Sequence, residues 1–124
     1  MRILLADDDP RICTVLRLWL EKRRHQVQQA PDGQQAWDML RTQPFDVLIT
    51  DVNMPRLDGA ELVRKLQGQA QPLRLIIILS SRCDLAHLRR QFPDPRVHCR
   101  AKPFSPADLA ELIDRLAAPQ ENPA

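Results

Sequence analysis

Four apolar runs in this chain each stop at a reactive polar residue. The runs are residues 3–6 before Asp7, Asp8 and Asp9, residues 47–50 before Asp51, residues 75–79 before Ser80 and Ser81, and residues 97–101 before Lys102. If these runs are parallel strands of one sheet, their carboxyl ends bring carboxylates, a hydroxyl and an ammonium into one crevice. Open α/β sheets place their binding sites in that crevice, so we expect the functional site there.

Helical patterns alternate with these runs. Apolar residues recur at helical spacing in residues 10–23, where Pro10 suits the first turn and Asp9 the cap. Further helices are expected near residues 34–42, 62–66, 85–92 and 106–116, and a weak strand at residues 26–30. This alternation predicts a doubly wound α/β domain with five parallel strands, five helices and right-handed crossovers.

The length of the chain, 124 residues, suits one domain with a hydrophobic core. We expect the domain to occupy residues 1–118. Residues 119–124 are interpreted as a tail or the start of a linker, and residues 68–72 as a break before the fourth strand.

Composition argues against several functions. The net charge of +2 is too small to favour nucleic acid, and 4% aromatic residues are too few for a platform that stacks bases. No apolar stretch approaches the roughly 20 residues that cross a bilayer. Acidic residues follow the N-terminal segment too soon for a signal peptide. We therefore expect a cytoplasmic protein without membrane contact.

Two other groups of residues are given structural interpretations. The basic clusters at residues 22–25 and 89–90 are expected to be solvated helix faces. The three cysteines, Cys13, Cys83 and Cys99, lack the spacing of a zinc or redox site and are expected to be structural thiols. A redox sensor is the minor alternative.

The acidic residues at the strand ends favour phosphoryl chemistry. Asp7, Asp8 and Asp51 cannot comfortably ionise side by side without a counter-charge. Magnesium supplies that charge and prefers oxygen ligands. A third carboxylate beside the metal can attack a phosphoryl group and hold it as an acyl phosphate. Lys102 would then neutralise charge on the transferring oxygens.

The chain resembles the receiver domains of two-component response regulators. The resemblance spans essentially all of the chain and rests on Asp7-Asp8, residues 31–36, residues 45–59, the apolar strand that runs into Ser80, and the Lys102-Pro103-Phe104 stretch. It implies a flavodoxin-like sheet with strand order 2-1-3-4-5.

The resemblance also implies roles for the acidic residues. Asp51 would be the phosphoacceptor, taking its phosphoryl group from a histidine kinase or a phosphotransfer protein. Asp8 would bind Mg²⁺ directly and Asp7 mainly through water. Asp51 and the backbone carbonyl of Asn53 would complete the protein ligands of the metal.

Other positions carry over from the same resemblance. Lys102 would contact the phosphoryl oxygens, and Ser80 would hydrogen-bond the phosphoryl group and pull its loop inward. Pro103 would follow a cis peptide bond. Cys99 stands where the family usually has an aromatic switch residue, and a small thiol cannot swing as a ring does. Arg82 lies where side chains often tune hydrolysis of the acyl phosphate.

The expected output is a conformational switch. Phosphorylation would bias the face formed by the fourth helix, fifth strand and fifth helix, through which a homodimer could also form. The domain would make no nucleic-acid contact and would catalyse only its own phosphorylation and dephosphorylation. The missing aromatic at Cys99 motivates an alternative, a docking module that works without phosphorylation. A phosphoester hydrolase is disfavoured, because Asn53 stands where such an enzyme carries a second acid.

Overall fold

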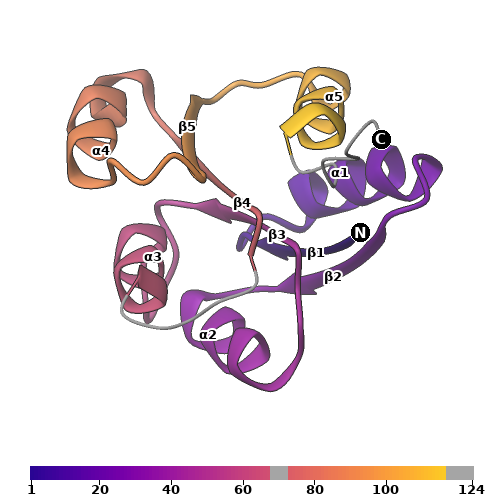
Figure 1. Cartoon of the computed structure of the whole chain (residues 1–124), viewed down its shortest axis with the longest axis horizontal. Helices are drawn as coiled ribbons and strands as arrows, with labels where there is room; N and C mark the ends of the chain where they lie inside the picture. The colour runs from indigo at the N-terminus through magenta and orange to yellow at the C-terminus, as the bar shows by residue number, and fades with distance from the viewer. Residues whose placement is uncertain (68–72, 117–124) are drawn as a thin grey trace, which may run out of the picture.

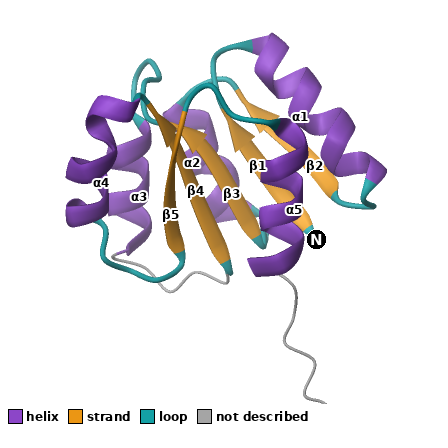
Figure 2. Cartoon of the chain, turned by 90° about the horizontal axis from the view of Figure 1, so that it is seen from above, coloured by secondary structure: helices purple, strands orange, loops and turns teal. Residues whose placement is uncertain are grey.

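The computed structural model describes residues 1–67 and 73–116. The predicted break at residues 68–72, the end of the predicted domain and the predicted tail lie outside the described residues. All five strands are parallel and form one sheet in the order β2-β1-β3-β4-β5, which confirms the expected order (Figure 2). The strands are β1 (Arg2–Ala6), β2 (Gln26–Ala30), β3 (Val47–Asp51), β4 (Leu75–Ser80) and β5 (Val97–Ala101).

Helices cover both faces of this sheet (Figure 1). They are α1 (Pro10–Lys22), α2 (Gly33–Thr42), α3 (Gly59–Gln67), α4 (Leu85–Gln91) and α5 (Pro106–Leu116), with a short 3-10 helix, η1 (Arg82–Asp84), before α4. α1 and α5 lie on one face, and α2 and α3 on the other (Figures 1 and 2). None of the helices in the described part of the chain is long and apolar enough to cross a membrane.

The core is divided by the sheet into two apolar clusters. In β1, Ile3 and Leu5 pack in the cluster that contains residues of α1 and α5. Leu4 and Ala6 pack in the cluster with α2, α3 and α4. Every residue of β3 and β4 is buried, as expected for parallel strands with helices on both faces. The sheet is therefore anchored from both sides, and its carboxyl edge is held in place.

Capping aspartates define two helix starts. The Asp9 carboxylate accepts from the backbone N–H of Arg11 at 2.9 Å and caps α1, as the sequence predicted. Asp32 caps α2 by accepting from the backbone N–H of Gln35 at 2.8 Å. Gly33 follows it because a Cβ there would lie 1.8 Å from the carbonyl oxygen of Leu57. The start of α2 is thus packed directly on the loop between β3 and α3.

The interpretation of residues 22–25 as a solvated helix face is wrong for His25. Its arginines are exposed, but His25 is only 9% exposed. The backbone N–H of His25 donates to the carbonyl of Leu20, near the end of α1, and Nε2 of its ring lies 2.7 Å from Asp114 Oδ1. The sequence pattern missed this because the contact partner of the ring, Asp114, lies on α5, far along the chain.

Candidate functional site

The acidic residues meet where β1 and β3 end side by side. The register pairs Ala6 with Thr50, so Asp7 and Asp51 follow at neighbouring positions. One carboxylate oxygen from each of Asp7, Asp8 and Asp51 lies within 4.8 Å of the other two. Asp7 and Asp51 are each only 7% exposed, while Asp8 faces solvent. The cluster is therefore a half-buried pocket of negative charge.

Lys102 reaches this cluster from the end of β5. Its Nζ lies 3.0 Å from Asp51 Oδ2 and 3.7 Å from Asp7 Oδ2. Burial alone would lower the pKa of Lys102, but the hydrogen bond and the charge of Asp51 raise it above its usual value. The backbone N–H of Lys102 donates to the Ser80 carbonyl at 2.8 Å, and the peptide bond to Pro103 is cis. Lys102 is thus a charged cation fixed against the carboxylate of Asp51.

Asp7 has one satisfied oxygen and one that is not. Oδ1 accepts from the backbone N–H of Asp9 at 2.9 Å. Oδ2 is buried and has no hydrogen-bond partner among the described residues, because Lys102 is too distant for one. Burial raises the pKa of Asp7, and the nearby charges of Asp51 and Asp8 raise it further.

The acidic cluster is suited to a metal ion. A buried carboxylate oxygen without a partner costs free energy unless something compensates it. A hard divalent cation bound by carboxylate oxygens would do so. The three aspartates offer ligand atoms at compatible spacing, so the residues present fit such an ion.

The backbone behind Asp51 is tightly packed. Thr50 is fully buried, and its hydroxyl donates to the Asp51 carbonyl at 3.0 Å. A Cβ on Gly59 would lie 2.2 Å from that same carbonyl oxygen. The backbone N–H of Gly59 donates to the Val52 carbonyl at 2.9 Å and closes the loop. Sequence reasoning passed over Thr50, although a polar residue at the end of an apolar strand was a usable signal.

Asn53 follows Asp51 in this loop. Its backbone N–H approaches Asp51 Oδ1 at 3.4 Å, and its side chain is exposed. The metal-ligand role expected for its carbonyl stays a prediction.

Ser80 is near the acidic cluster but does not donate to it. Its side chain is 1% exposed, and its hydroxyl donates to the Ser81 carbonyl at 3.1 Å. The residue is the last of β4 rather than the first after it, and it pairs with Ala101 of β5. Rotation about one side-chain bond would redirect this hydroxyl.

Cys99 is part of the core. It is 3% exposed and belongs to the same apolar cluster as Leu88 of α4. Burial raises the pKa of its thiol. The thiol therefore packs between β5 and α4. The backbone of Arg82 lies in η1, two residues past Ser80, but its side chain lies outside the described part of the structure.

Cys13 lies beneath the acidic cluster. Its Sγ lies 3.6 Å from the Asp7 carbonyl oxygen. Burial, followed by the charges of Asp7 and its neighbours, raises the pKa of this thiol to about 11. Cys13, Cys83 and Cys99 are all free, and the first and last are buried. Sequence reasoning treated Cys13 as a structural thiol, and its contact with the Asp7 backbone adds support beneath the cluster.

The strand ends thus define a doubly wound α/β protein with a metal-compatible acidic cluster and a lysine beside a buried aspartate. The family model described as "Response regulator receiver domain" matches residues 3–114. The chain belongs to the response regulator receiver domain family. Members of this family are signalling modules.

Known relatives agree with this assignment. Response regulator MprA from Mycobacterium tuberculosis is 36% identical over 118 residues, which cover 95% of this chain and 50% of that protein. Response regulator GtcR from Aneurinibacillus migulanus is 41% identical over 80 residues, 64% of this chain and 32% of that protein. The chain therefore spans half or less of the length of these relatives.

A solved structure shows the same fold. The receiver domain of the sensor histidine kinase PA1611 from Pseudomonas aeruginosa aligns with a TM-score of 0.80 at 28% identity. The alignment covers 95% of this chain and 98% of that one. Receiver domains similar to this chain therefore occur in sensor kinases as well as in response regulators.

Proposed function

We propose that Asp51 accepts a phosphoryl group in a Mg²⁺-dependent transfer from a histidine kinase or a phosphotransfer protein. The observation that carries this proposal is the buried oxygen of Asp7 that lacks a hydrogen-bond partner among the described residues and lies beside two further carboxylates and a lysine. A cluster built only for stability would satisfy that oxygen. We expect this phosphoryl transfer to take place in the cytoplasm, as part of a two-component system.

Asp7, Asp8, Asp51 and the Asn53 carbonyl are the groups that would hold the metal ion. The receiver domain of PA1611 is described with a magnesium ion coordinated in its active-site cleft, which supports the same metal here. When bound, Mg²⁺ would neutralise negative charge on the phosphoryl oxygens. The three aspartates would hold the ion at the carboxyl edge of the sheet.

The chain's own residues would orient the transfer. An Asp51 carboxylate oxygen attacks phosphorus while the bond to the donor nitrogen breaks, and the electron pair leaves with the imidazole of the donor. Asp51 then carries an acyl phosphate, and its former partner Lys102 pairs with a phosphoryl oxygen. Ser80 donates its hydroxyl to another phosphoryl oxygen by turning away from the Ser81 carbonyl.

A groove beside the site suits the phosphodonor protein. It has a volume of about 640 Å³ and lies between the start of α1 and the loop before α5. Ile12, Val15 and Phe104 are among its apolar lining residues, and Lys102 lines it as well. Val15 is 43% exposed and Trp19, one turn further along α1, is 39% exposed. An apolar helix face of a histidine-bearing partner would cover these side chains and bring its histidine to Asp51.

Intact-mass measurement after incubation with acetyl phosphate and Mg²⁺ tests the proposal. We expect the unaltered chain to gain one phosphoryl group, and both Asp51→Asn and removal of the metal by a chelator to abolish the gain. Asp38→Asn, which alters an exposed carboxylate on α2, is the matched control and should be phosphorylated normally. Phosphorylation of Asp51→Asn would contradict the proposal. A chain that never gains phosphoryl mass would favour the phosphorylation-independent docking module.

A further inference from the structure

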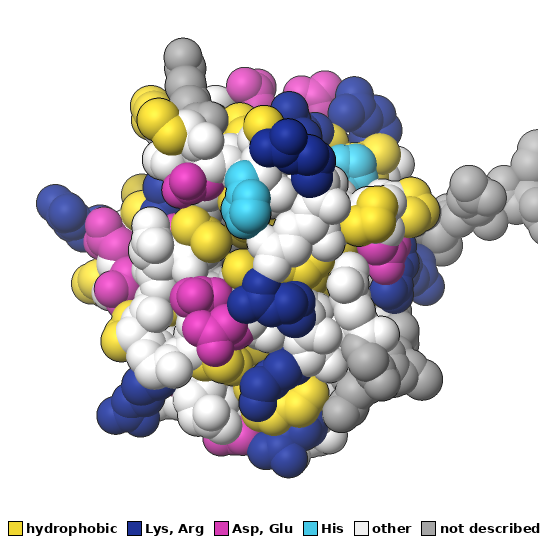
Figure 3. All heavy atoms as spheres, turned by 90° about the vertical axis from the view of Figure 1, so that its left-hand side faces the viewer, with side chains coloured by type: hydrophobic (Ala, Val, Ile, Leu, Met, Phe, Trp, Pro, Cys, Tyr) yellow, Lys and Arg dark blue, Asp and Glu magenta, His cyan; other side chains and the backbone are white. Residues whose placement is uncertain are grey.

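Two surfaces of the molecule differ in the apolar area that they offer to a ligand. On the side that carries α4, Figure 3 shows acidic, basic and histidine side chains interspersed with apolar ones. The groove between the start of α1 and the loop before α5, which we call the α1 groove, is different. Its apolar lining residues are Ile12, Val15, Leu16, Pro103, Phe104 and Pro106. An apolar ligand is therefore expected in the α1 groove rather than on the α4 side.

The α1 groove shares a residue with the acidic cluster. Lys102 lines the groove, and its Nζ lies 3.0 Å from Asp51 Oδ2. A ligand whose phosphoryl group contacts Lys102 can therefore reach Asp51 while the rest of it lies in the groove. The α1 groove is thus placed to hold the leaving part of a phosphodonor.

The other charged residues of the α1 groove leave its apolar lining available. They are Asp9 and Arg11, which pair with each other at 3.4 Å. The side chain of Arg11 is 90% exposed, so most of it faces solvent. The volume of about 640 Å³ lies within the range of small-molecule sites. A ligand that extends from Lys102 into the groove therefore meets apolar surface.

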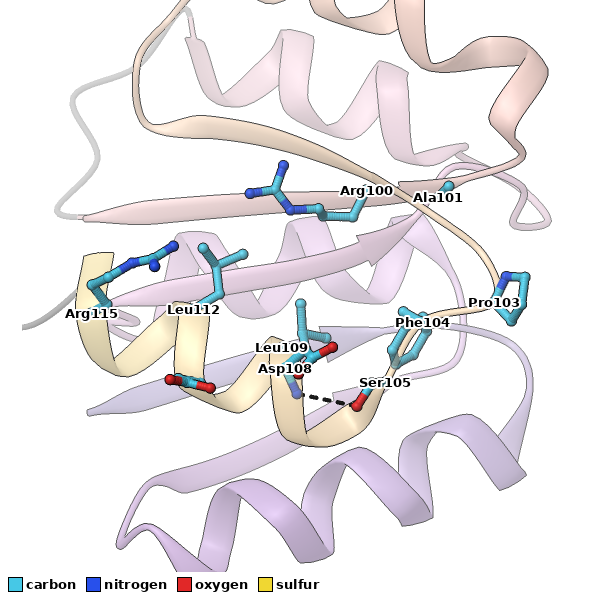
Figure 4. Close-up of a pocket in the computed structure, with 10 residues that line it drawn as sticks. Arg100, Ala101, Pro103, Phe104, Ser105, Asp108, Leu109, Leu112 and Arg115 are labelled. Atoms are coloured by element: carbon cyan, nitrogen blue, oxygen red, sulfur yellow. Dashed lines mark hydrogen bonds between the residues drawn. The ribbon is translucent and has the colours of Figure 1, made fainter.

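Both walls of the α1 groove are fixed by helix caps. Figure 4 shows Pro103 and Phe104 on the loop that joins β5 to α5. In the same view, the Ser105 hydroxyl accepts from the backbone N–H of Asp108 at 3.3 Å, which holds the start of α5. On the other wall, Asp9 caps the start of α1. The groove is therefore formed before a ligand arrives.

The product of the proposed transfer limits the class of small-molecule donor. A phosphorylated aspartate is a mixed anhydride of a carboxylic acid and phosphoric acid. Transfer from another acyl phosphate exchanges one such anhydride for another, whereas a phosphate ester would have to give up a more stable bond. A carboxylate also leaves without a proton at neutral pH, so this transfer needs no general acid. A small donor with an apolar leaving part is therefore an acyl phosphate that carries an aliphatic chain.

We propose that the α1 groove binds the aliphatic chain of a short-chain acyl phosphate and so favours such donors over acetyl phosphate. The inference rests on the proposed phosphorylation of Asp51 and names a class of substrate for it. An Asp51 carboxylate oxygen attacks phosphorus, the bond between phosphorus and the acyl oxygen breaks, and the electron pair leaves with the released carboxylate. Ile12, Val15 and Phe104 contact the chain, which takes the place of the apolar helix face of a phosphodonor protein.

A series of acyl phosphates that differ only in chain length tests the proposal. Acetyl, propionyl, butyryl and pentanoyl phosphate release carboxylates of nearly equal basicity, and their reaction with hydroxylamine corrects for any difference in intrinsic reactivity. Intact mass gives the initial rate of phosphorylation of the full chain in Mg²⁺ at several donor concentrations.

We expect the second-order rate constant to rise with chain length. Full burial of a methylene would give about fourfold per methylene. Val15 is 43% exposed, so the groove is open on one side. We therefore expect about twofold per methylene, or about half of the full free energy of burial.

Variants of α1 locate the binding of the chain. Ile12→Gln and Val15→Gln place a polar side chain in the lining and should each flatten the rise with chain length. The matched control is Leu18→Gln, because Leu18 is on the same helix, is 58% exposed and does not line the groove. The comparison uses the slope within each variant, so a general change in rate does not affect it. Thermal melts check that all variants fold.

The possible failures are distinguishable. If the rate constant stayed level or fell with chain length while acetyl phosphate still phosphorylated Asp51, this inference would be overturned and the proposed function would stand. A slope reduced as much in Leu18→Gln as in Val15→Gln would also overturn it, because the chain would then bind outside the groove. If no donor phosphorylated the chain, the phosphorylation of Asp51 itself would be contradicted.

Discussion

Polar clusters lie at both ends of the sheet, and they differ in how many of their carboxylate oxygens have hydrogen-bond partners. At the carboxyl ends of the strands, Asp7 keeps a buried oxygen without a hydrogen-bond partner among the described residues. At the amino ends, Asp114 of α5 uses both oxygens. Its Oδ1 lies 2.7 Å from Nε2 of buried His25, and its Oδ2 accepts from Arg23 at 2.6 Å.

The pKa values of the two aspartates move in opposite directions. Burial and neighbouring carboxylates raise the pKa of Asp7. Burial also acts to raise that of Asp114, but hydrogen bonds from Arg23 and His25 outweigh it and hold the pKa below its usual value. The amino-end cluster, formed by Arg23, His25 and Asp114, therefore stabilises the fold by joining the α1–β2 turn to α5. The carboxyl-end cluster, formed by Asp7, Asp8, Asp51 and Lys102, keeps a carboxylate oxygen available to a ligand.

Gly59→Ala should have the largest effect on stability. The new Cβ would overlap the Asp51 carbonyl, so the loop must shift at a cost of about 2 kcal/mol or more. Because the moved backbone carries Asp51, phosphorylation by acetyl phosphate should fall as well. Urea denaturation and intact mass measure the two effects. An unchanged free energy of unfolding would show that the loop can shift to make room for the Cβ without cost.

Asp114→Ala should lower the free energy of unfolding by about 1–2 kcal/mol, since it leaves a buried His25 nitrogen without its partner. Phosphorylation should be unchanged, in contrast with Gly59→Ala. Asp108→Ala, an exposed residue of the same helix, is the control for loss of charge on α5. If Asp114→Ala slowed phosphorylation, the separation between the two clusters would be lost.

Addition of Mg²⁺ should stabilise only the carboxyl-end cluster. At ten times the dissociation constant, binding raises the free energy of unfolding by about 1.4 kcal/mol. The gain should persist in Asp114→Ala and disappear in Asp8→Asn, because Asp8 offers one of the ligand oxygens. Thermal melts with and without the metal provide the measurement. If Mg²⁺ stabilised Asp8→Asn as much as the unaltered chain, Asp8 would not be a ligand of the metal.

The smallest expected effect is a pH dependence of the amino-end cluster. Because the folded pKa of Asp114 is depressed, its contribution is complete above the unfolded pKa of about 3.9. The contribution is lost as the pH falls through the lower folded value. The stability difference between the unaltered chain and Asp114→Ala should therefore shrink below about pH 4 in urea denaturation series. A constant difference would mean that the Asp114 charge contributes little.

The meeting of the site residues was predictable from the sequence, because parallel strands place their last residues at one edge of the sheet. This explains why Asp7, Asp51 and Lys102, far apart in the chain, were expected together. The strand order came from the family resemblance, since apolar runs do not specify their neighbours. The helix start at Asp9 was predicted from the local sequence, because the cap and Pro10 of the first turn are adjacent.

Contacts made only by the packed fold were not predictable. Gly59 was expected to shape a loop, but its approach to the Asp51 carbonyl depends on how α3 packs against β3. The burial of His25 depends on Asp114, which is 89 residues away. Asp7 Oδ2 lacks a hydrogen-bond partner among the described residues because Lys102 Nζ stops 3.7 Å away, and that distance is set by the packed fold.

Burial of the whole of β4 also has a consequence for how the chain must fold. Its segment Leu75-Ile76-Ile77-Ile78-Leu79 is apolar, uncharged and free of proline. Such a segment readily forms intermolecular cross-β structure while it is exposed. In the native sheet it is paired on both sides, with β3 and with β5. Nascent chains are therefore most prone to aggregate in the interval after β4 leaves the ribosome and before β5 pairs with it.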